Sequence, residues 1–202
     1  HRSAKPVLGL LCLWPCVWLV WGAAKDALGA NPAEFVIRAT GDWTLRFLCL
    51  TLAVTPLRVM WGLPELLRFR RLLGLFTYFY AVWHLLCYSW LDMGLAWGDI
   101  AADMAKRPFI WLGFSAFALL TPLAVTSFNR AIRWLGIKRW QGLHRLVYGV
   151  AVLAVLHFYW MRAGKHNFAE VWVYASVIAG LLAWRVFHRH AKPQRASTQA
   201  KT

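Results

Sequence analysis

The chain has 202 residues, of which 60% are hydrophobic and only 15% charged. The mean hydropathy of +0.47 and the 14 tryptophans lie outside the usual composition of soluble domains and predict an integral membrane protein. The formal net charge of +15 does not indicate a nucleic-acid partner, because no soluble basic domain accompanies the apolar stretches. Without a soluble domain, the sequence predicts no soluble nucleotide-binding fold. We therefore expect this protein to work within the membrane or with a partner.

Six apolar stretches have about the 20 residues that a helix needs to cross the hydrocarbon core. The first is interpreted as a span rather than a cleaved signal peptide, because its apolar core is long and rich in tryptophan. The predicted fold is all-α, a six-helix transmembrane bundle over residues 1–188 followed by a disordered basic tail over residues 189–202. In chain order, the expected spans are Val7–Ala24, Trp43–Met60, Leu72–Leu91, Phe109–Thr126, Trp140–Met161 and Val171–Phe187.

Lysine and arginine are distributed unevenly between the two sides of this predicted bundle. The side that carries both termini receives sixteen of the 23 basic residues and, among the acids, only Glu65. The opposite side carries seven basic and seven acidic residues. The positive-inside rule therefore predicts cytoplasmic termini, and contact with anionic lipid headgroups accounts for the excess of positive charge.

The loop after the first span contains the signals of a helix start. Asn31 is suited to an N-cap, Pro32 to the first helical position and Glu34 to the first turn. Gly41 is expected to end this helix, so the loop is predicted to hold a short interfacial helix.

Two Thr-Pro pairs, Thr55-Pro56 and Thr121-Pro122, lie within the second and fourth spans. Each proline leaves a backbone carbonyl of the preceding turn without its usual partner, so both spans are expected to be kinked. The cysteines form no CxxC pair and are interpreted as small buried hydrophobic residues. They are Cys12, Cys16, Cys49 and Cys87.

Three of the seven histidines, His84, His144 and His157, lie within apolar spans. A polar side chain there needs a partner, either an interhelical hydrogen bond or a cofactor. The third and fifth spans run in the same direction, and His84 and His157 lie about 18 and 25 Å from their starts. Two imidazoles that face each other at one depth can bind an iron from both faces of a porphyrin. We therefore predict His84 and His157 as axial ligands of a haem; zinc is less suitable, because no carboxylate is near.

Small and aromatic residues of the same two spans are consistent with a flat cofactor, although close helix packing explains the small ones equally well. Those expected to let the ring approach are Gly74, Ala81, Gly149, Ala151 and Ala154, and those expected to pack on it are Phe76, Tyr80 and Trp83.

His144 lies near the cytoplasmic edge and about 140° around the helix from His157. With Arg70, Arg71 and Arg145 it forms a predicted basic cluster suited to haem propionates, a flavin phosphate or a quinone carbonyl. An ordinary positive-inside cluster is the alternative. A second haem bound by His144 stays open, because arginine occupies the positions where a second histidine would be expected.

Several segments together resemble the MsrQ family, also called YedZ, within the ferric-reductase-like transmembrane group. The resemblance covers nearly the whole chain, and the order and spacing of the segments make it specific. The segments are LGANPAEFVIRATGDWTLRFL (28–48), TPLR (55–58), RRLLGL (70–75) with the following His84-Leu85 and Tyr88, RPFIWLG (107–113) and WQGLHRLVYGVAVLAVLHFYW (140–160).

The resemblance implies a subunit that binds b-type haem through His84, His144 and His157. It implies a bacterial inner-membrane location, electrons taken from the quinone pool, and their transfer to a periplasmic molybdenum-containing methionine-sulfoxide reductase subunit. The family is also described as carrying FMN; contacts to it from Arg70 or Arg71 are an inference, since no FMN motif is recognisable. Such a subunit has no catalytic residues of its own. The alternatives are a self-standing ferric-chelate or cytochrome b561-type oxidoreductase, a non-redox transporter and a structural subunit.

Overall fold

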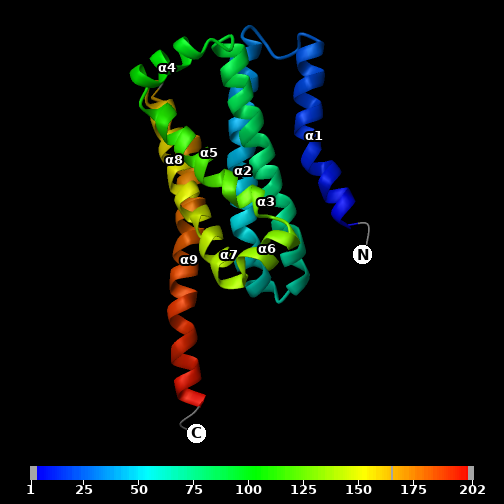
Figure 1. Cartoon of the computed structure of the whole chain (residues 1–202), viewed down its shortest axis with the longest axis vertical. Coiled ribbons are helices and arrows are strands. Elements are labelled where there is room, and N and C mark those ends of the chain that lie inside the picture. The colour runs from blue at the N-terminus through cyan, green and yellow to red at the C-terminus, as the bar shows by residue number, and fades with distance from the viewer. Residues whose placement is uncertain (1–3, 165, 200–202) are drawn as a thin grey trace.

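The computed structural model describes residues 4–164 and 166–199, with side chains for residues 4–164 and 166–188. All regular structure in these residues is helical (Figure 1). A 3-10 turn, η1 (Pro64–Leu66), precedes α3, and a π-helical turn, η2 (Tyr88–Asp92), follows it. The α-helices are α1 (Ala4–Ala24), α2 (Pro32–Trp61), α3 (Leu67–Cys87), α4 (Trp97–Lys106), α5 (Phe109–Val125), α6 (Asn129–Leu135), α7 (Ile137–His144), α8 (Leu146–Ala163) and α9 (Ala169–Gln199).

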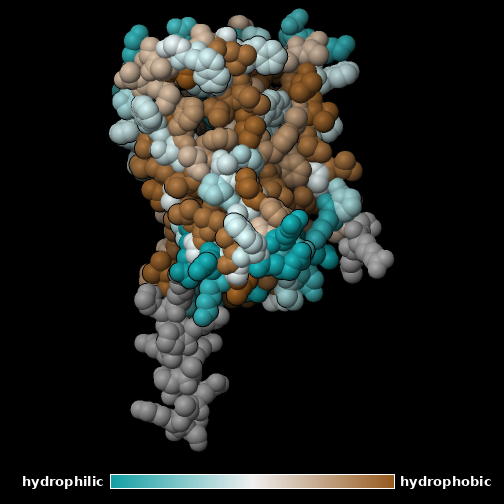
Figure 2. Space-filling view, viewed as in Figure 1, coloured by the Kyte–Doolittle hydropathy of each residue, from teal (hydrophilic) through white to brown (hydrophobic). Residues whose placement is uncertain are grey.

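Among the described residues, five helical segments are long and apolar enough to cross a membrane. The α4–α5 pair passes the same test together and would make a sixth span, but it is bent by 113°, and α4 lies across the end of the bundle (Figure 1). Hydrophobic side chains cover the middle of the visible face, and hydrophilic ones gather towards its ends (Figure 2). The prediction of an all-α, multi-pass membrane protein is confirmed. The five segments are Ala4–Ala24, Pro32–Trp61, Pro64–Asp92, Ile137–Ala163 and Ala169–His188.

The bundle has two ends, named here for the short helix that lies at each. The α4 end comprises the α1–α2 connection, η2, α4 and the α8–α9 connection. The α6 end comprises η1, the start of α3, α6 and α7. These are the two groups of segments that the six-span prediction assigned to opposite sides of the membrane.

Two antiparallel hairpins form the centre of the bundle. In one, α2 packs along α3, and in the other, α5 packs along α8. The main hydrophobic core lies where the hairpins and α9 meet, with Leu52, Leu120 and Ala151 among its buried members. The space between these hairpins holds the candidate site.

Near two of the prolines inside helices, polar side chains from other helices bond to the backbone. Pro15 lies inside α1, and one residue later the Tyr80 hydroxyl accepts from the Cys16 amide at 3.1 Å and donates to the Cys12 carbonyl at 2.9 Å. The buried hydroxyl thus replaces an intrahelical hydrogen bond. Pro56 leaves the carbonyl of Leu52 without its usual donor, and the Arg185 guanidinium of α9 donates to it.

The predicted interfacial helix that ends at Gly41 is wrong. Asn31 does cap a helix, since its side chain accepts from the Glu34 amide at 3.2 Å, but α2 continues without a break to Trp61. It ends at Gly62, whose φ of 65° is the left-handed conformation that favours glycine. Gly41 instead lies in the helix interior, where the lack of a side chain makes room for His84.

The C-terminal segment beyond residue 188 was expected to be a disordered basic tail. The structure continues α9 as far as Gln199. Residues 200–202 of the predicted tail lie outside the described residues. The boundary at residue 188 stays a prediction.

Candidate functional site

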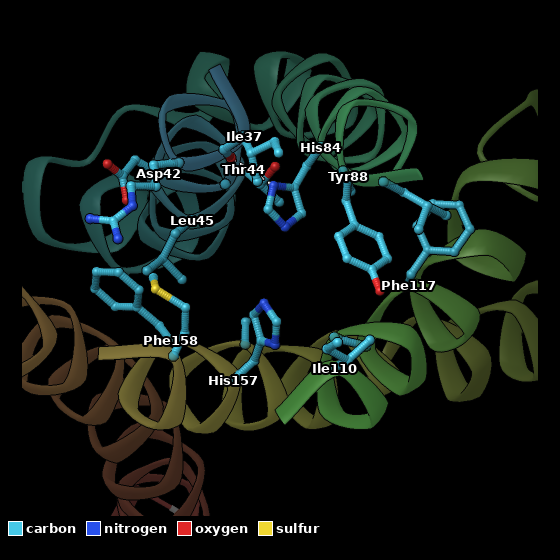
Figure 3. A pocket seen from close by; sticks show the side chains of 18 of the residues that line it. Ile37, Asp42, Thr44, Leu45, His84, Tyr88, Ile110, Phe117, His157 and Phe158 are labelled. Atoms are coloured by element: carbon cyan, nitrogen blue, oxygen red, sulfur yellow. Dashed lines mark hydrogen bonds between the residues drawn. The ribbon is translucent and has the colours of Figure 1, made fainter. Parts of the chain in front are cut away.

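A cavity of about 420 Å³ lies between the two hairpins. It extends from the middle of the bundle towards the α4 end, and its walls come from α2, α3, α5 and α8 (Figure 3). Its inner lining is mainly aliphatic and aromatic, and includes Leu45, Leu48, Ile110, Phe117, Val150 and Phe158. Such a volume and lining are usual for sites that bind an apolar cofactor or ligand.

His84 of α3 and His157 of α8 face each other across this cavity, as Figure 3 shows. Their ring centroids are 6.3 Å apart, and their planes are nearly perpendicular, at 79°. Metal–imidazole bonds of about 2.0–2.1 Å and about 1.1 Å from nitrogen to ring centre would place two rings about 6.3 Å apart around one metal ion. The pair therefore has the spacing needed to bind a single metal ion from both sides.

The second nitrogen of each ring is held by a backbone carbonyl. The Nδ1 of His84 lies 2.9 Å from the Ile37 carbonyl oxygen, and the Nδ1 of His157 lies 2.7 Å from that of Phe109. Because a carbonyl oxygen only accepts, each Nδ1 carries the proton and donates it. The lone pair of each Nε2 is then available to a metal, which is the arrangement that orients histidine ligands in known sites.

A glycine lies one helical turn after each of these carbonyls and contacts the ring. A Cβ at Gly41 would lie 3.2 Å from the Cε1 atom of His84, and one at Gly113 would lie 2.9 Å from the Cε1 atom of His157. The α2–α3 and α5–α8 hairpins therefore repeat one arrangement of carbonyl, glycine and histidine. Forty-three residues separate Gly41 from His84, and forty-four separate Gly113 from His157.

Sequence reasoning missed both glycines. It considered small residues of the third and fifth spans only, whereas the repeat in the structure joins each histidine to a glycine of a neighbouring helix. The sequence does place a glycine 43 or 44 residues before each histidine of the pair. This spacing can be recognised as a contact only when it is known that α2 packs along α3 and α5 along α8.

The predicted cofactor-packing residues fall into two groups. Ala81 and Ala154 line the cavity, as expected. The others lie outside its lining, so their packing on a cofactor stays a prediction. Gly74 and Gly149 approach Thr51 and Leu119, Ala151 lies in the main core, and Phe76, Tyr80 and Trp83 pack with residues of α1 and α2.

Charged residues that sequence reasoning did not select surround the cavity at the α4 end. Arg38 pairs with Glu34 at 2.5 Å, and both line the cavity with Arg107. Arg107 forms an ion pair and two hydrogen bonds with Asp103, which also accepts from the Tyr88 hydroxyl at 2.8 Å. Among the described residues, Arg38 and Arg107 are the arginines that line the cavity.

The ionisation of Asp103 reflects these contacts. Burial acts to raise the pKa of this carboxyl, but the hydrogen bonds from Arg107 and Tyr88 outweigh it and hold the pKa below the usual value. The hydrogen bond to Asp103 in turn raises the pKa of Arg107. The pair is thus ionised at neutral pH.

His144 lies at the α6 end and does not line the cavity. The Thr126 hydroxyl donates to the Pro122 carbonyl at 2.6 Å and therefore accepts from the Nε2 of His144 at 3.1 Å. The Trp140 ring lies against the imidazole, with centroids 4.0 Å apart. His144 therefore has the interhelical hydrogen bond that sequence reasoning left open as the structural alternative.

Arg70 and Arg71 are also at the α6 end, where their positive charges act on His144. Arg71 donates to the Asn129 side chain at 2.8 Å. Neither arginine lines the cavity, so the structure does not bring the predicted basic cluster to the histidine pair. Among the described residues, no group of three or more His, Cys, Asp or Glu could hold a metal ion.

The sequence comparisons identify the family. A family model described as ferric reductase like transmembrane component matches residues 40–155. The chain is also similar to proteins named protein-methionine-sulfoxide reductase heme-binding subunit MsrQ. The relative from Polaromonas naphthalenivorans is 64% identical over 195 residues, which cover 96% of this chain and 89% of the relative. The chain belongs to the MsrQ family.

Other MsrQ relatives agree with this assignment. The protein from Ralstonia nicotianae is 53% identical over 92% of this chain and 86% of its own length. The protein from Herminiimonas arsenicoxydans is 48% identical over 98% of this chain and 91% of its own length. The ferric-reductase-like match includes Gly41, His84 and Gly113 and ends two residues before His157. The MsrQ similarity extends over nearly the whole chain, and so over both hairpins.

Proposed function

We propose that this protein is the haem-binding, electron-transfer subunit of a methionine-sulfoxide reductase system. The observation that carries the proposal is the facing pair of His84 and His157, with ring centroids 6.3 Å apart in an apolar cavity. The printed names of the MsrQ relatives describe heme-binding subunits, which agrees with this pair.

The residues of the cavity fit a b-type haem. Two neutral imidazoles offer their Nε2 lone pairs, the carbonyls of Ile37 and Phe109 fix the ring orientation, and the inner walls of the cavity are mainly apolar. Such surroundings tune the reduction potential of a bound haem, which supplies the reversible one-electron chemistry. The protein contributes ligands, orientation and a low dielectric.

Arg38 and Arg107 are our candidates to hold the haem propionates. Both line the cavity at the α4 end, and guanidinium groups bind carboxylates through charge-assisted hydrogen bonds. Arg70, Arg71 and Arg145, considered for this role from the sequence, do not line the cavity. Arg70 and Arg71 remain candidates for a flavin or quinone at the α6 end, and the role of His144 as a ligand of a second haem stays a prediction.

We further propose the direction of electron flow. The excess of basic residues at the α6 end supports a cytoplasmic position for that end. Electrons would then come from the quinone pool of the inner membrane, or from FMN, and would leave through the α4 end. There the partner would be a periplasmic molybdenum-containing methionine-sulfoxide reductase subunit. The position of the histidine pair towards the α4 end supports this direction.

A reduced-minus-oxidised visible spectrum of the purified protein, combined with haem quantification, tests the proposal. We expect a low-spin b-type spectrum that is lost in His84→Ala and in His157→Ala. His166→Ala serves as the matched control, because this histidine is exposed in the α8–α9 connection. A folded, haem-free wild-type protein, or full haem content in His84→Ala and His157→Ala, would contradict it. Ferric-chelate reduction without a partner subunit would favour the self-standing oxidoreductase.

A further inference from the structure

A second pocket, of about 200 Å³, lies between α2, α3, α8 and α9 on the side of the bundle facing the α6 end. We call it the basic pocket. Its polar lining is formed by Thr55, Arg58, Arg70, Tyr148, Arg185 and His188. It is separate from the histidine cavity, since the two share no lining residue.

The basic pocket gathers three guanidinium groups, from Arg58, Arg70 and Arg185, and none of its described lining residues is a carboxylate. Like charges that share a small, partly buried pocket repel one another. A bound anion would relieve this repulsion.

Arg185 is held rigidly in the wall of the pocket. It is 9% exposed and donates to the carbonyls of Leu52 and Leu181. Its guanidinium lies 5.5 Å from the centroid of the Tyr148 ring. Since the Leu52 carbonyl is available because of Pro56, this proline helps to fix one positive charge of the pocket in place.

Arg58 provides an independent sign of a missing ligand. Its Nε atom is buried and has no hydrogen-bond partner among the described residues, as is also true of Arg68 and Arg162, but of these three arginines only Arg58 lines the basic pocket. A buried polar atom without a partner is costly and needs an explanation. A phosphate oxygen in the basic pocket would supply an acceptor for this donor, with charge assistance.

The apolar residues beside the pocket indicate which phosphate compound it takes. Val59 lines the pocket and is 38% exposed, and on α9 Val186 and Phe187, which follow Arg185, are 55% and 73% exposed. Exposed apolar side chains next to a basic pocket are surfaces that a lipid molecule can contact while its phosphate occupies the pocket. Basic pockets between transmembrane helices are known to bind such headgroups.

We propose that the basic pocket binds the phosphate group of an anionic phospholipid. A soluble phosphate compound could bind the same arginines, but it would lack acyl chains to contact Val59, Val186 and Phe187. The proposal is independent of haem binding, because none of its residues lines the histidine cavity.

Native mass spectrometry of the detergent-solubilised protein with phosphatidylglycerol, and in parallel with phosphatidylcholine, tests this assignment. We expect specific retention of phosphatidylglycerol, and about a tenfold weaker affinity in Arg58→Gln, as for the loss of one hydrogen bond to a charged group. The affinity of Arg58→Lys for phosphatidylglycerol should lie between those of wild type and Arg58→Gln, because lysine keeps the positive charge. Arg133→Gln is the matched control, because this exposed arginine of α6 lies outside the basic pocket.

Circular dichroism establishes that each variant is folded. An equal loss of phosphatidylglycerol affinity in Arg58→Gln and Arg133→Gln would overturn the proposal and indicate an unspecific basic surface. Equal retention of phosphatidylglycerol and phosphatidylcholine by wild type would also overturn it. Displacement of phosphatidylglycerol by inorganic phosphate or FMN at comparable concentrations would overturn the lipid assignment and indicate a soluble phosphate compound.

Discussion

The imidazole of His157 lies so close to Gly113 that a Cβ at this position would be 2.9 Å from the Cε1 atom and 3.0 Å from Nδ1. The ring cannot easily withdraw, because its Nδ1 is tied to the Phe109 carbonyl. Any side chain at Gly113 must therefore displace either the ring or the helix that carries it.

We predict that Gly113→Ala lowers haem occupancy markedly, or shifts the haem spectrum and midpoint potential. Gly41→Ala should have a smaller effect, since its Cβ would lie 3.2 Å from the His84 ring. Haem quantification, visible spectra and redox titration measure these changes.

Gly74→Ala and Gly149→Ala are the matched controls. Their added Cβ atoms would meet Thr51 at 3.7 Å and Leu119 at 3.8 Å, which are ordinary contacts. If Gly113→Ala behaved like Gly149→Ala in haem content, spectrum and potential, the proposed role of this glycine would be wrong.

Tyr80→Phe should destabilise the attachment of α1. The change keeps the ring but removes the hydroxyl between Cys16 and Cys12, leaving two backbone groups without partners beside Pro15. The expected loss is about 1–3 kcal/mol of the free energy of unfolding, measured by denaturant titration in detergent. Tyr159→Phe is the control, because this tyrosine is more exposed and should change stability little. An equal effect of the two changes would contradict the prediction.

Arg185 and Pro56 should be energetically coupled. Pro56→Ala restores an amide that can donate to the Leu52 carbonyl, so Arg185→Gln should cost less stability in the Pro56→Ala background than in wild type. A double-mutant cycle on unfolding free energies measures the coupling. The same cycle with Pro122→Ala, in a different helix, should give additive effects; additivity in both cycles would rule the coupling out.

Asp103 should make stability depend on acid pH. Its pKa is lowered in the folded protein, so its contribution is complete above the usual pKa of about 3.9 and is lost as the pH falls through the lower, folded value. The melting temperature of wild type should therefore fall below about pH 4, and less steeply in Asp103→Asn. Parallel curves for the two proteins between pH 7 and pH 3 would contradict this.

Depth along a helix could be predicted from the sequence, but the direction and partner of each side chain could not. Apolar runs located the spans, and counting residues from their starts placed His84 and His157 at similar levels. The contact of His84 with Gly41, however, depends on how α2 packs along α3. Gly41 had the local features of a helix end, and only the neighbouring imidazole explains a glycine inside the helix.

For the arginines, too, the sequence indicated the depth in the membrane but not which cavity each residue lines. Arg70 and Arg71 were selected because they are close to His144 along the predicted membrane depth, and they do act on it. Arg38 and Arg107 were passed over, because nothing in their local sequence indicates that α2 and the start of α5 meet at one cavity. Residues of different hairpins come together only in the tertiary structure.

Each imidazole takes its orientation from its own hairpin, His84 from α2 through Ile37 and His157 from α5 through Phe109. The spacing of the two rings therefore measures how far apart the hairpins lie. A metal centre bound to both rings would join the two halves of the bundle and restrain their relative movement. Loss of the cofactor should then be detectable far from the iron, as faster amide hydrogen exchange in the parts of α2 and α8 that contribute to the main hydrophobic core.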